Sequence, residues 1–411
     1  MARIAMFLAR SPGAPMTGRK AVIHTAIAAL ASEHELDLFI LAKQEPQEVP
    51  RGVRRAVWLG ALPKARALCN AALALLAGRR SLNEALFLSG ERLRRVRALA
   101  RGYDFAIADT VRAAPYAEAL GVPWHLDLDD LFSTRYARYL RQPRGELAAE
   151  LILGYFRGSV PSAASAIPES ALRALLASES ARLRRREIYW ARKATTVSLV
   201  SPDEADGFSR VVGRPVFSLP MAVRVPAQRW TAAAAQGAPA VFLGGLDYKP
   251  NLDALRFYQA HVYPKVRRRC GTPSLRHIGN APASLRRGFA PEVVHFEGYV
   301  DDVASRLAKA PLFMAPIVSG SGIKTKVLEA MAVGLPVLAT REAVSGLKVE
   351  HCRHCFVCER PEDFPAGMQF LSQPGAAEAV GQNARSYVER SFTLEVLGQR
   401  WRNVMEALAA C

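Results

Sequence analysis

The segment 315–340, APIVSGSGIKTKVLEAMAVGLPVLAT, holds the residues best suited to bind a phosphate group. The apolar run Leu312–Ile317 predicts a buried strand, and the small residues Ser319 to Gly322 follow it. Their backbone N–H groups can converge on an anion without obstruction by side chains. A helix beginning near Ile323 would point its free N–H groups and the positive end of its dipole at the loop. The predicted donors to a diphosphate are the amides of Gly320, Gly322 and Ile323.

Charged residues of the same segment fit a nucleotide. Lys324 and Lys326 fall in the first helical turn, where cations oppose the helix dipole unless an external anion offsets them. Glu329 is the lone carboxylate of an otherwise apolar helix that ends at Gly334, and it is placed to accept hydrogen bonds from two sugar hydroxyls. The alternative is an ordinary strand–loop–helix unit with turn glycines and a solvated glutamate.

The segment closely resembles the donor-site motif of retaining glycosyltransferases of the GT-B fold, usually called family 4, in the variant GxGxKxKxxEAMAxGxPV. The resemblance continues through Val241–Asn251, Arg276–Pro282 and His295–Asp302. It implies an α/β protein with two Rossmann-like domains facing across a cleft. One position departs from the pattern, because most members carry a first glutamate where this chain has Ser321, so the role of that glutamate is not carried over.

The resemblance also implies a chemical scheme. A nucleoside diphosphate leaves readily only if its developing negative charge is stabilised. Lys324, as a catalytic residue, with Lys326 and Lys249 would supply positive charge in place of a divalent metal. Gly245 would lie in the donor site, and Val300 would meet the base. We therefore expect retention of anomeric configuration, a nucleotide-sugar co-substrate, no bound metal and no other cofactor.

Two features of the N-terminal half suit an acceptor. The loop Ser11–Gly18 ends in Gly18-Arg19 at a predicted helix start, which fits either an acceptor anion or a simple strand–helix connection. In the segment 124–136, WHLDLDDLFSTRY, three carboxylates follow a predicted strand. Asp127 and Asp130 are the predicted catalytic residues that orient the acceptor hydroxyl, with Arg135 pairing one of them. Capping of the next helix by either aspartate is the alternative.

Alternating strand and helix patterns predict two domains, residues 1–230 for the acceptor and 231–386 for the donor. The small residues of Gln228–Pro239 suggest a linker. The helix at about 387–410 is expected to pack back on the first domain. Ser201 is interpreted as a helix cap.

The net charge of +18 lies mainly in the N-terminal half, since residues 1–235 hold 34 Lys and Arg against 21 Asp and Glu, and residues 236–411 hold 21 against 16. The arginine clusters favour peripheral contact with an anionic membrane, although an arginine-rich composition alone gives the same excess. Basic residues are not interleaved with aromatics, so no nucleic-acid partner is expected. Without a secretory signal or a transmembrane run, we expect a cytoplasmic protein, on the inner face of the plasma membrane when docked.

Six cysteines without a disulfide pattern are expected to be free thiols. The cluster 351–358, HCRHCFVC, has spacing that zinc sites use, but its last four residues read as a buried strand.

We expect transfer of a sugar from a nucleotide-sugar to a glycan or lipid-linked acceptor in bacterial surface or exopolysaccharide biosynthesis. The alternatives are a nucleotide-sugar epimerase of the same fold and a non-catalytic basic protein that binds membrane or nucleic acid.

Overall fold

The computed structural model describes residues 1–12, 18–46, 48–141, 168–235, 239–271, 274–320 and 322–410. The chain divides into two compact units, residues 1–219 with 398–411 and residues 220–397. We call them unit 1 and unit 2 and describe each by itself. Parts of the Ser11–Gly18 loop and of the predicted linker, together with Ser321 and Cys411, lie outside the described residues.

Unit 1 is built on a seven-stranded parallel sheet in the order β3-β2-β1-β4-β5-β6-β7. The inner strands β2, β1, β4, β5 and β6 are mostly apolar and buried, as expected for parallel strands covered on both faces, whereas the edge strands β3 and β7 are half-buried or exposed. The strands are β1 Arg3–Leu8, β2 Glu35–Ile40, β3 Val53–Trp58, β4 Phe105–Asp109, β5 Trp124–Asp127, β6 Thr196–Leu199 and β7 Phe217–Ser218.

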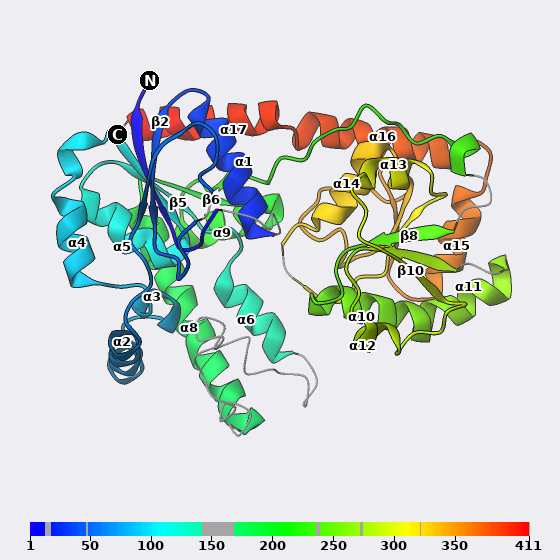
Figure 1. The fold of residues 1–411 in the computed structure, drawn as a ribbon, viewed down its shortest axis with the longest axis horizontal. Coiled ribbons are helices and arrows are strands. Elements are labelled where there is room, and N and C mark those ends of the chain that lie inside the picture. Colours follow the sequence, from blue (N-terminus) through cyan, green and yellow to red (C-terminus); the bar gives the residue numbers. More distant parts are fainter. Residues whose placement is uncertain are drawn as a thin grey trace. The chain divides into compact units, whose positions relative to one another are not determined.

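Helices connect most successive strands of unit 1 in a βαβ pattern, although β3 follows β2 without a helix among the described residues (Figure 1). Ser201 accepts a hydrogen bond from the Glu204 amide at 3.4 Å, which confirms its prediction as a helix cap. The helices are α1 Arg19–Ala31, α2 Lys64–Ala77, α3 Leu82–Ala85, α4 Gly90–Arg97, α5 Thr110–Leu120, α6 Phe132–Leu140, α8 Glu169–Lys193 and α9 Pro202–Val212.

Unit 2 contains a six-stranded parallel sheet in the order β10-β9-β8-β11-β12-β13. Strand order reverses between β8 and β11, which is where open α/β sheets bind ligands beyond their carboxyl ends. The strands are β8 Ala240–Leu243, β9 Leu275–Ile278, β10 Val294–Gly298, β11 Phe313–Ala315, β12 Val337–Thr340 and β13 Phe356–Cys358.

Helices surround the sheet of unit 2 (Figure 1). They are α10 Lys249–Phe257, α11 Tyr263–Cys270, α12 Ala283–Arg286, α13 Val303–Ala308, α14 Thr325–Val333, α15 Asp363–Leu371 and α16 Ala376–Ser391, with a π-helical turn Tyr258–Val262 before α11. Helix α16 packs closely on the end of α14, because a Cβ on Gly381 would lie 2.1 Å from the carbonyl oxygen of Gly334.

The segment predicted as a linker is partly a packed element of unit 2. Trp230 is buried, and its indole donates a hydrogen bond to the Ala310 carbonyl at 2.7 Å. The guanidinium of Arg385 donates to the carbonyls of Pro226 and Gln228, at 3.0 and 3.4 Å. The small residues of this segment predicted a linker. That prediction missed these hydrogen bonds because the partner residues lie far away in the sequence.

Helix α17, Leu394–Ala409, returns the chain to unit 1 from Gly398 onward. Trp401 is 2% exposed and packs edge-on against His125, with ring centroids 5.2 Å apart. Arg402 forms an ion pair with Glu33 at 2.5 Å. Among the described residues, no helix is both long enough and apolar enough to cross a bilayer.

Candidate functional site

The glycine loops at the carboxyl ends of β8 and β9 bring two backbones into contact. Gly244 and Gly279 both have positive φ, 133° and 137°. A Cβ on Gly279 would lie 2.8 Å from the carbonyl carbon of Gly244, and a Cβ on Gly244 would lie 2.5 Å from the Lys326 ammonium nitrogen. A larger residue at Gly244 or Gly279 would force the neighbouring backbone or the Lys326 ammonium to move. Glycine at both positions therefore allows the two loops and the lysine to lie close together.

Helix α14 begins at Thr325, two residues later than predicted, with Lys324 as its N-cap residue in an extended conformation. The loop before it contains Gly320 and Gly322, at φ 118° and 69°. None of the described residues accepts a hydrogen bond from the amides of Gly320, Gly322 or Ile323. These three donors, with the positive end of the α14 dipole, form an arrangement that favours an anion.

Lys326 supplies a cation beside this loop. Its ammonium donates a hydrogen bond to the Asn251 side-chain oxygen and lies 4.8 Å from the centre of the Phe242 ring. No carboxylate of the described residues forms an ion pair with it. Burial lowers the pKa of Lys326 to about 7, an effect that Glu329 opposes and Lys324 adds to. Among the described residues, the Lys326 ammonium therefore has no direct ion-pair partner.

Lys324 and Lys249 are arranged differently from Lys326. The Lys324 ammonium is buried and donates to Glu342 at 2.9 Å and to Ser345 at 3.0 Å. The Lys249 ammonium is exposed and pairs with Asp253 at 2.7 Å. The structure thus singles out Lys326 among the three predicted cations, while the predicted catalytic role of Lys324 stays a prediction.

Glu329 projects from the exposed side of α14. Desolvation by its surroundings raises the pKa of its carboxyl, and Lys326 opposes that shift. Val300 is half-buried after β10, beside Tyr299, whose side chain is 80% exposed. The predicted contacts of Glu329 with ribose hydroxyls and of Val300 with a base stay predictions.

Asn251 and His277 are site residues that the sequence argument missed. Asn251 donates to the Gly245 carbonyl at 2.7 Å while accepting from Lys326, so it fixes both the ammonium and the predicted donor-site glycine. His277 donates through Nε2 to the Gly244 carbonyl at 2.7 Å, and burial lowers its pKa to about 4. The available signal was their place in the two motif segments Val241–Asn251 and Arg276–Pro282, where Asn251 lies in the first turn of α10 and His277 lies within β9.

Carboxylates of unit 1 gather at the carboxyl ends of β4 and β5 around one buried arginine. The Arg19 guanidinium donates to Asp109 at 2.9 and 3.0 Å and to Asp127 at 2.8 Å, and lies 3.4 Å from Asp129. The predicted anion-binding cation thus faces protein carboxylates. Gly18 is the N-cap of α1 with φ 51°. A part for Gly18 and Arg19 in acceptor binding stays a prediction.

The predicted pairing of Arg135 holds. Its guanidinium donates to Asp130 through Nε at 2.9 Å and also through Nη2. Neither Asp127 nor Asp130 caps α6, whose N-cap is Leu131 without a side-chain hydrogen bond, so the capping alternative is wrong.

Asp129 is the carboxylate of this group that the sequence argument passed over. It has φ 66°, and its side chain is 14% exposed, against 4% for Asp127. Burial raises its pKa to about 6, Arg19 opposes the shift, and Asp130 adds to it. A carboxylate with this pKa can take up or release a proton near neutrality, as a general acid or base requires.

His125 connects to this group through two hydroxyls. Ser198 donates to Asp127 at 3.2 Å, so it accepts from His125 Nε2 at 2.9 Å. The other ring nitrogen, Nδ1, then accepts from Thr196 at 2.9 Å. Burial lowers the pKa of His125 to about 4, so the ring is neutral and positions Asp127 without carrying charge.

The cysteine and histidine cluster 351–358 is occupied by structural contacts. His354 and His351 accept hydrogen bonds from the amides of Glu350 and Val357, both at 3.0 Å. Burial raises the pKa of Cys355 to about 12. Within the described residues, no three His, Cys, Asp or Glu side chains are placed to hold a metal ion, and the five cysteines are free thiols.

Two parallel sheets with these loops define the GT-B fold, and comparison with known proteins supports the class. Residues 239–373, about a third of the chain, match the family described as glycosyl transferases group 1, so unit 2 carries a glycosyltransferase domain and the chain is an enzyme of that type. No curated protein matches the chain by sequence at a significant level.

Solved structures share the fold over nearly the whole chain. Anabaena Alr3699/HepE, in complex with UDP and glucose, has 13% identity and a TM-score of 0.61, covering 98% of this chain and 99% of its own. Sucrose-phosphate synthase from Thermosynechococcus elongatus has 17% identity and a TM-score of 0.63 and covers all of both chains. WaaG, a glycosyltransferase involved in lipopolysaccharide biosynthesis, has 14% identity and a TM-score of 0.59, covering 98% of this chain and 99% of its own.

Proposed function

We propose that this protein transfers a sugar, with retention, from a nucleotide-sugar to a glycan or lipid-linked acceptor in bacterial surface or exopolysaccharide biosynthesis, as a family 4 enzyme. One observation carries the proposal. The amides of Gly320, Gly322 and Ile323 have no acceptor among the described residues, and they lie in the same loop–helix unit as Lys326, whose ammonium has no carboxylate partner there. A diphosphate supplies what both lack, acceptors for the amides and a counter-ion for the ammonium.

The same groups explain how the leaving group is stabilised. As the glycosidic bond breaks, negative charge develops on the diphosphate. Hydrogen bonds from donors that are already in place then become stronger, and no protein group has to move. Asn251 holds Lys326 in place, and the N-terminus of α14 holds the loop amides. Lys324 is the predicted catalytic cation of the same unit, and its ammonium is fixed by an ion pair with Glu342. These cations replace a divalent metal, so chelators are expected to leave transfer unchanged.

Related structures support a nucleotide-sugar donor, since Alr3699/HepE has been crystallised with UDP and with UDP-glucose. Glu329 then accepts hydrogen bonds from two ribose hydroxyls, and Val300 and Tyr299 meet the base. On the acceptor side, Asp127 and Asp130 orient the attacking hydroxyl, and Asp129 is a third candidate because its pKa of about 6 suits proton transfer. We place the enzyme at the cytoplasmic face of an anionic membrane.

The test is thermal stabilisation by a panel of UDP-, GDP-, ADP- and dTDP-sugars, with and without EDTA. A ligand at a hundredfold excess over its Kd adds about 2.7 kcal/mol to the free energy of unfolding. We expect one nucleotide class to stabilise the protein, and Glu329→Ala and Lys326→Met to lose that effect. Absence of stabilisation by every nucleotide-sugar would refute the donor site and favour a non-catalytic protein.

Transfer itself is then measured with the donor so identified. Release of nucleoside diphosphate in the presence of lipid-linked or glycan acceptors, with the anomer of the product read by NMR, distinguishes a transferase from an epimerase. An epimerase would interconvert the nucleotide-sugar without an acceptor.

A further inference from the structure

Helix α2 of unit 1 exposes almost its whole apolar surface. Its sequence, KARALCNAALALLA, has no charged residue after Arg66, yet only Ala67 and Ala74 are buried. Four leucines form what we call the leucine face, and they are 58%, 59%, 42% and 85% exposed at Leu68, Leu73, Leu75 and Leu76. Apolar patches of this kind on a soluble unit mark an interaction surface.

The helix is fixed on the unit, so these leucines stay exposed. Asn70 donates to the carbonyls of Ala85 and Leu88, at 3.0 and 2.9 Å. Arg182 of α8 donates to the carbonyls of Ala74 and Leu75, both at 3.2 Å, at the end of α2. Figure 1 shows α2 at the periphery of unit 1, with none of the labelled helices or strands of that unit on its outer side.

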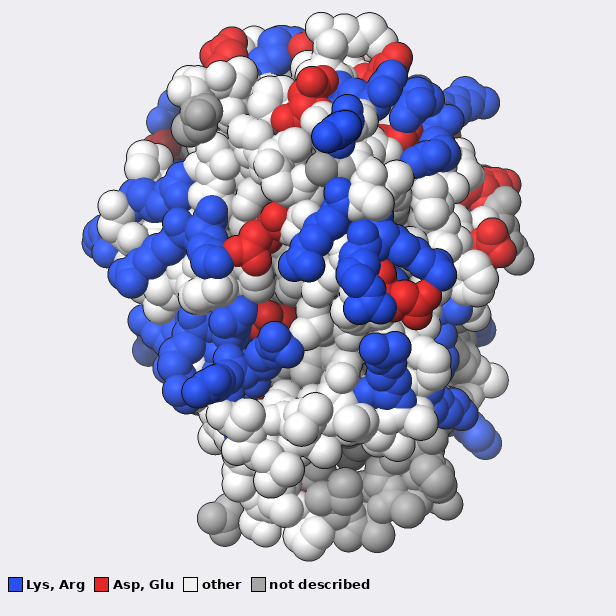
Figure 2. All heavy atoms as spheres, turned by 90° about the vertical axis from the view of Figure 1, so that its left-hand side faces the viewer, with Lys and Arg blue, Asp and Glu red and all other residues white. Residues whose placement is uncertain are grey.

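The sequence around the leucine face is strongly basic. Residues 51–100 hold eleven Lys and Arg against two acidic residues, Glu84 and Glu91. Both acids are already paired, Glu84 with Arg186 at 2.7 Å and Glu91 with Arg95 at 2.7 Å. Figure 2 shows this side of the molecule, with clusters of basic side chains above an area that lacks charged groups.

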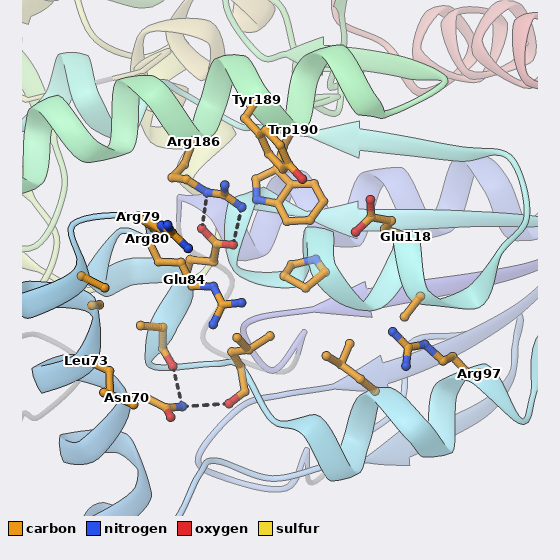
Figure 3. Close-up of a pocket in the computed structure, with 17 residues that line it drawn as sticks. Asn70, Leu73, Arg79, Arg80, Glu84, Arg97, Glu118, Arg186, Tyr189 and Trp190 are labelled. Carbon is orange, nitrogen blue, oxygen red and sulfur yellow. Dashed lines mark hydrogen bonds and ion pairs between the residues drawn. The ribbon is translucent and has the colours of Figure 1, made fainter.

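A pocket of about 780 Å³ opens next to α2 (Figure 3). Leu73, Ala74 and Ala77 of α2 form one wall, and Arg79, Arg80 and Arg97 bring three guanidinium groups to it. No described residue forms an ion pair with any of these three arginines. The opposite wall includes Trp190, whose buried indole N–H has no acceptor among the described residues.

We propose that this face docks on an anionic lipid membrane, with the leucine face in the interfacial region of the bilayer and the phosphate of a lipid headgroup in the pocket beside Arg79, Arg80 and Arg97. The proposal deepens the membrane contact proposed above and rests on it, but it does not depend on the donor site. An apolar helix face flanked by arginines is the composition of helices that lie in the membrane interface.

Charge complementarity selects a membrane over a second copy of the chain. A symmetric dimer through the leucine face would bring two sets of unpaired arginines together, which like-charge repulsion opposes. An anionic bilayer supplies both apolar chains for the leucines and phosphates for the arginines. Each basic residue near such a surface strengthens binding roughly fivefold, and the effect falls with salt.

The test is co-sedimentation of the full chain with vesicles of phosphatidylcholine alone or with about 30% phosphatidylglycerol. We expect binding only to the anionic vesicles, weakened by salt. The double variant Leu73→Ser/Leu76→Ser should weaken it at least tenfold, since two leucines lose their apolar burial. Arg79→Gln/Arg80→Gln should weaken it roughly 25-fold, as two charges are removed.

Arg267→Gln/Arg268→Gln is the matched control, because these arginines are exposed on α11 of unit 2 and carry the same charge change. It should bind vesicles like the unchanged protein. An environment-sensitive fluorophore on exposed Cys69 of α2 should report a less polar surrounding when anionic vesicles are added. If the nucleotide-sugar stabilises every variant, the fold and the donor site are intact. If it stabilises none of the proteins, including the unchanged one, the proposed glycosyltransferase function is wrong, and this result is separate from the vesicle binding.

Three results would overturn the proposal. They are equal binding to neutral and anionic vesicles, unchanged binding by both double variants, and a dimer that Leu73→Ser/Leu76→Ser converts to a monomer without any vesicle binding. The last result would assign the leucine face to a second copy of the chain.

Discussion

Lys326 should make donor binding depend on pH in the neutral range. Burial and the nearby charge of Lys324 lower the pKa of its ammonium to about 7 in the free protein, although Glu329 opposes the shift. A bound diphosphate next to the ammonium favours the charged form, so the pKa rises in the complex. A group whose pKa is raised by binding makes its full contribution to the affinity at pH values below its pKa in the free protein. That contribution is lost as the pH increases above this value. Donor affinity should therefore be highest below about pH 7 and fall above it.

The size of the effect follows from the protonated fraction of Lys326. With a pKa of about 7, about 90% of the ammonium is protonated at pH 6 and about 10% at pH 8. If the charged form alone binds, the apparent Kd rises about tenfold over that interval, in proportion to the loss of the competent state. Above pH 8 it rises about tenfold for each further unit, or about 1.4 kcal/mol, until the pKa of the complex is reached.

Isothermal titration with an intact nucleotide-sugar between about pH 6 and 8.5 measures this directly. Each phosphate of such a donor has one ester and one anhydride linkage and keeps a single strongly acidic hydroxyl, which is ionised throughout the range, so the protein supplies the slope. Binding at pH 8 should also take up close to one proton, which appears as a dependence of the measured heat on the ionisation enthalpy of the buffer. Lys326→Met should bind weakly at every pH, with no slope.

Lys249→Met is the matched control, since this exposed lysine has a carboxylate partner in Asp253. It should keep the slope of the unchanged protein. A flat affinity profile in the unchanged protein would refute the argument, because it would mean that Lys326 is charged across the whole range. A slope that survives Lys326→Met would assign the titration to another group.

Three further results are expected. Glu329→Ala should weaken donor binding about 10- to 100-fold in titration calorimetry, as a charged acceptor of two hydroxyl hydrogen bonds is lost. Gly381→Ala should lower the free energy of unfolding by about 1–3 kcal/mol in denaturant melts, because its Cβ would meet the Gly334 carbonyl at 2.1 Å. Glu187 has a pKa of about 7, raised by burial from 4.5, so the folded state holds the proton longer. Stability should therefore fall by up to about 3 kcal/mol as pH rises from 4.5 to 7, and Glu187→Gln should flatten that fall.

Each of these has its own control. Glu292→Ala removes an exposed carboxylate of unit 2 and should leave donor binding unchanged, and equal losses in both variants would argue against a ribose contact. Gly398→Ala faces open space on α17 and should stabilise the protein by about 0.5–1 kcal/mol, so a loss at this position would show that added side chains are harmful in general. An unchanged pH profile in Glu187→Gln would assign the fall to Asp129 and Glu204, whose pKa values are also raised.

Local patterns predicted the framework well. The apolar run Leu312–Ile317, predicted as a buried strand, contains β11 Phe313–Ala315, because a short apolar run between turn residues is typical of a buried strand in a parallel sheet. The end of α14 at Gly334 was also predicted, since a glycine at positive φ stops a helix by its own geometry.

The chemistry of the sites depends on partners far apart in sequence, which local patterns do not contain. Lys326 meets Asn251 across 75 residues, and Arg19 meets Asp127 across 108. Sequence reasoning therefore chose Lys324 as the catalytic cation, although its ammonium pairs with Glu342, whereas Lys326 has no ion-pair partner among the described residues. It also chose Asp127 and Asp130 over Asp129, because the burial that raises the pKa of Asp129 exists only in the fold.

The return of α17 to unit 1 sets an order of events during synthesis. The whole of unit 2 lies between residues 220 and 397, so it can fold as soon as that continuous stretch has left the ribosome. Unit 1 begins earlier but lacks Trp401, which covers His125, until residues 398–410 have been made. The first sheet to emerge is thus the last to receive its full cover, because the part of its face around His125 in the inner strand β5 waits for the C-terminal helix.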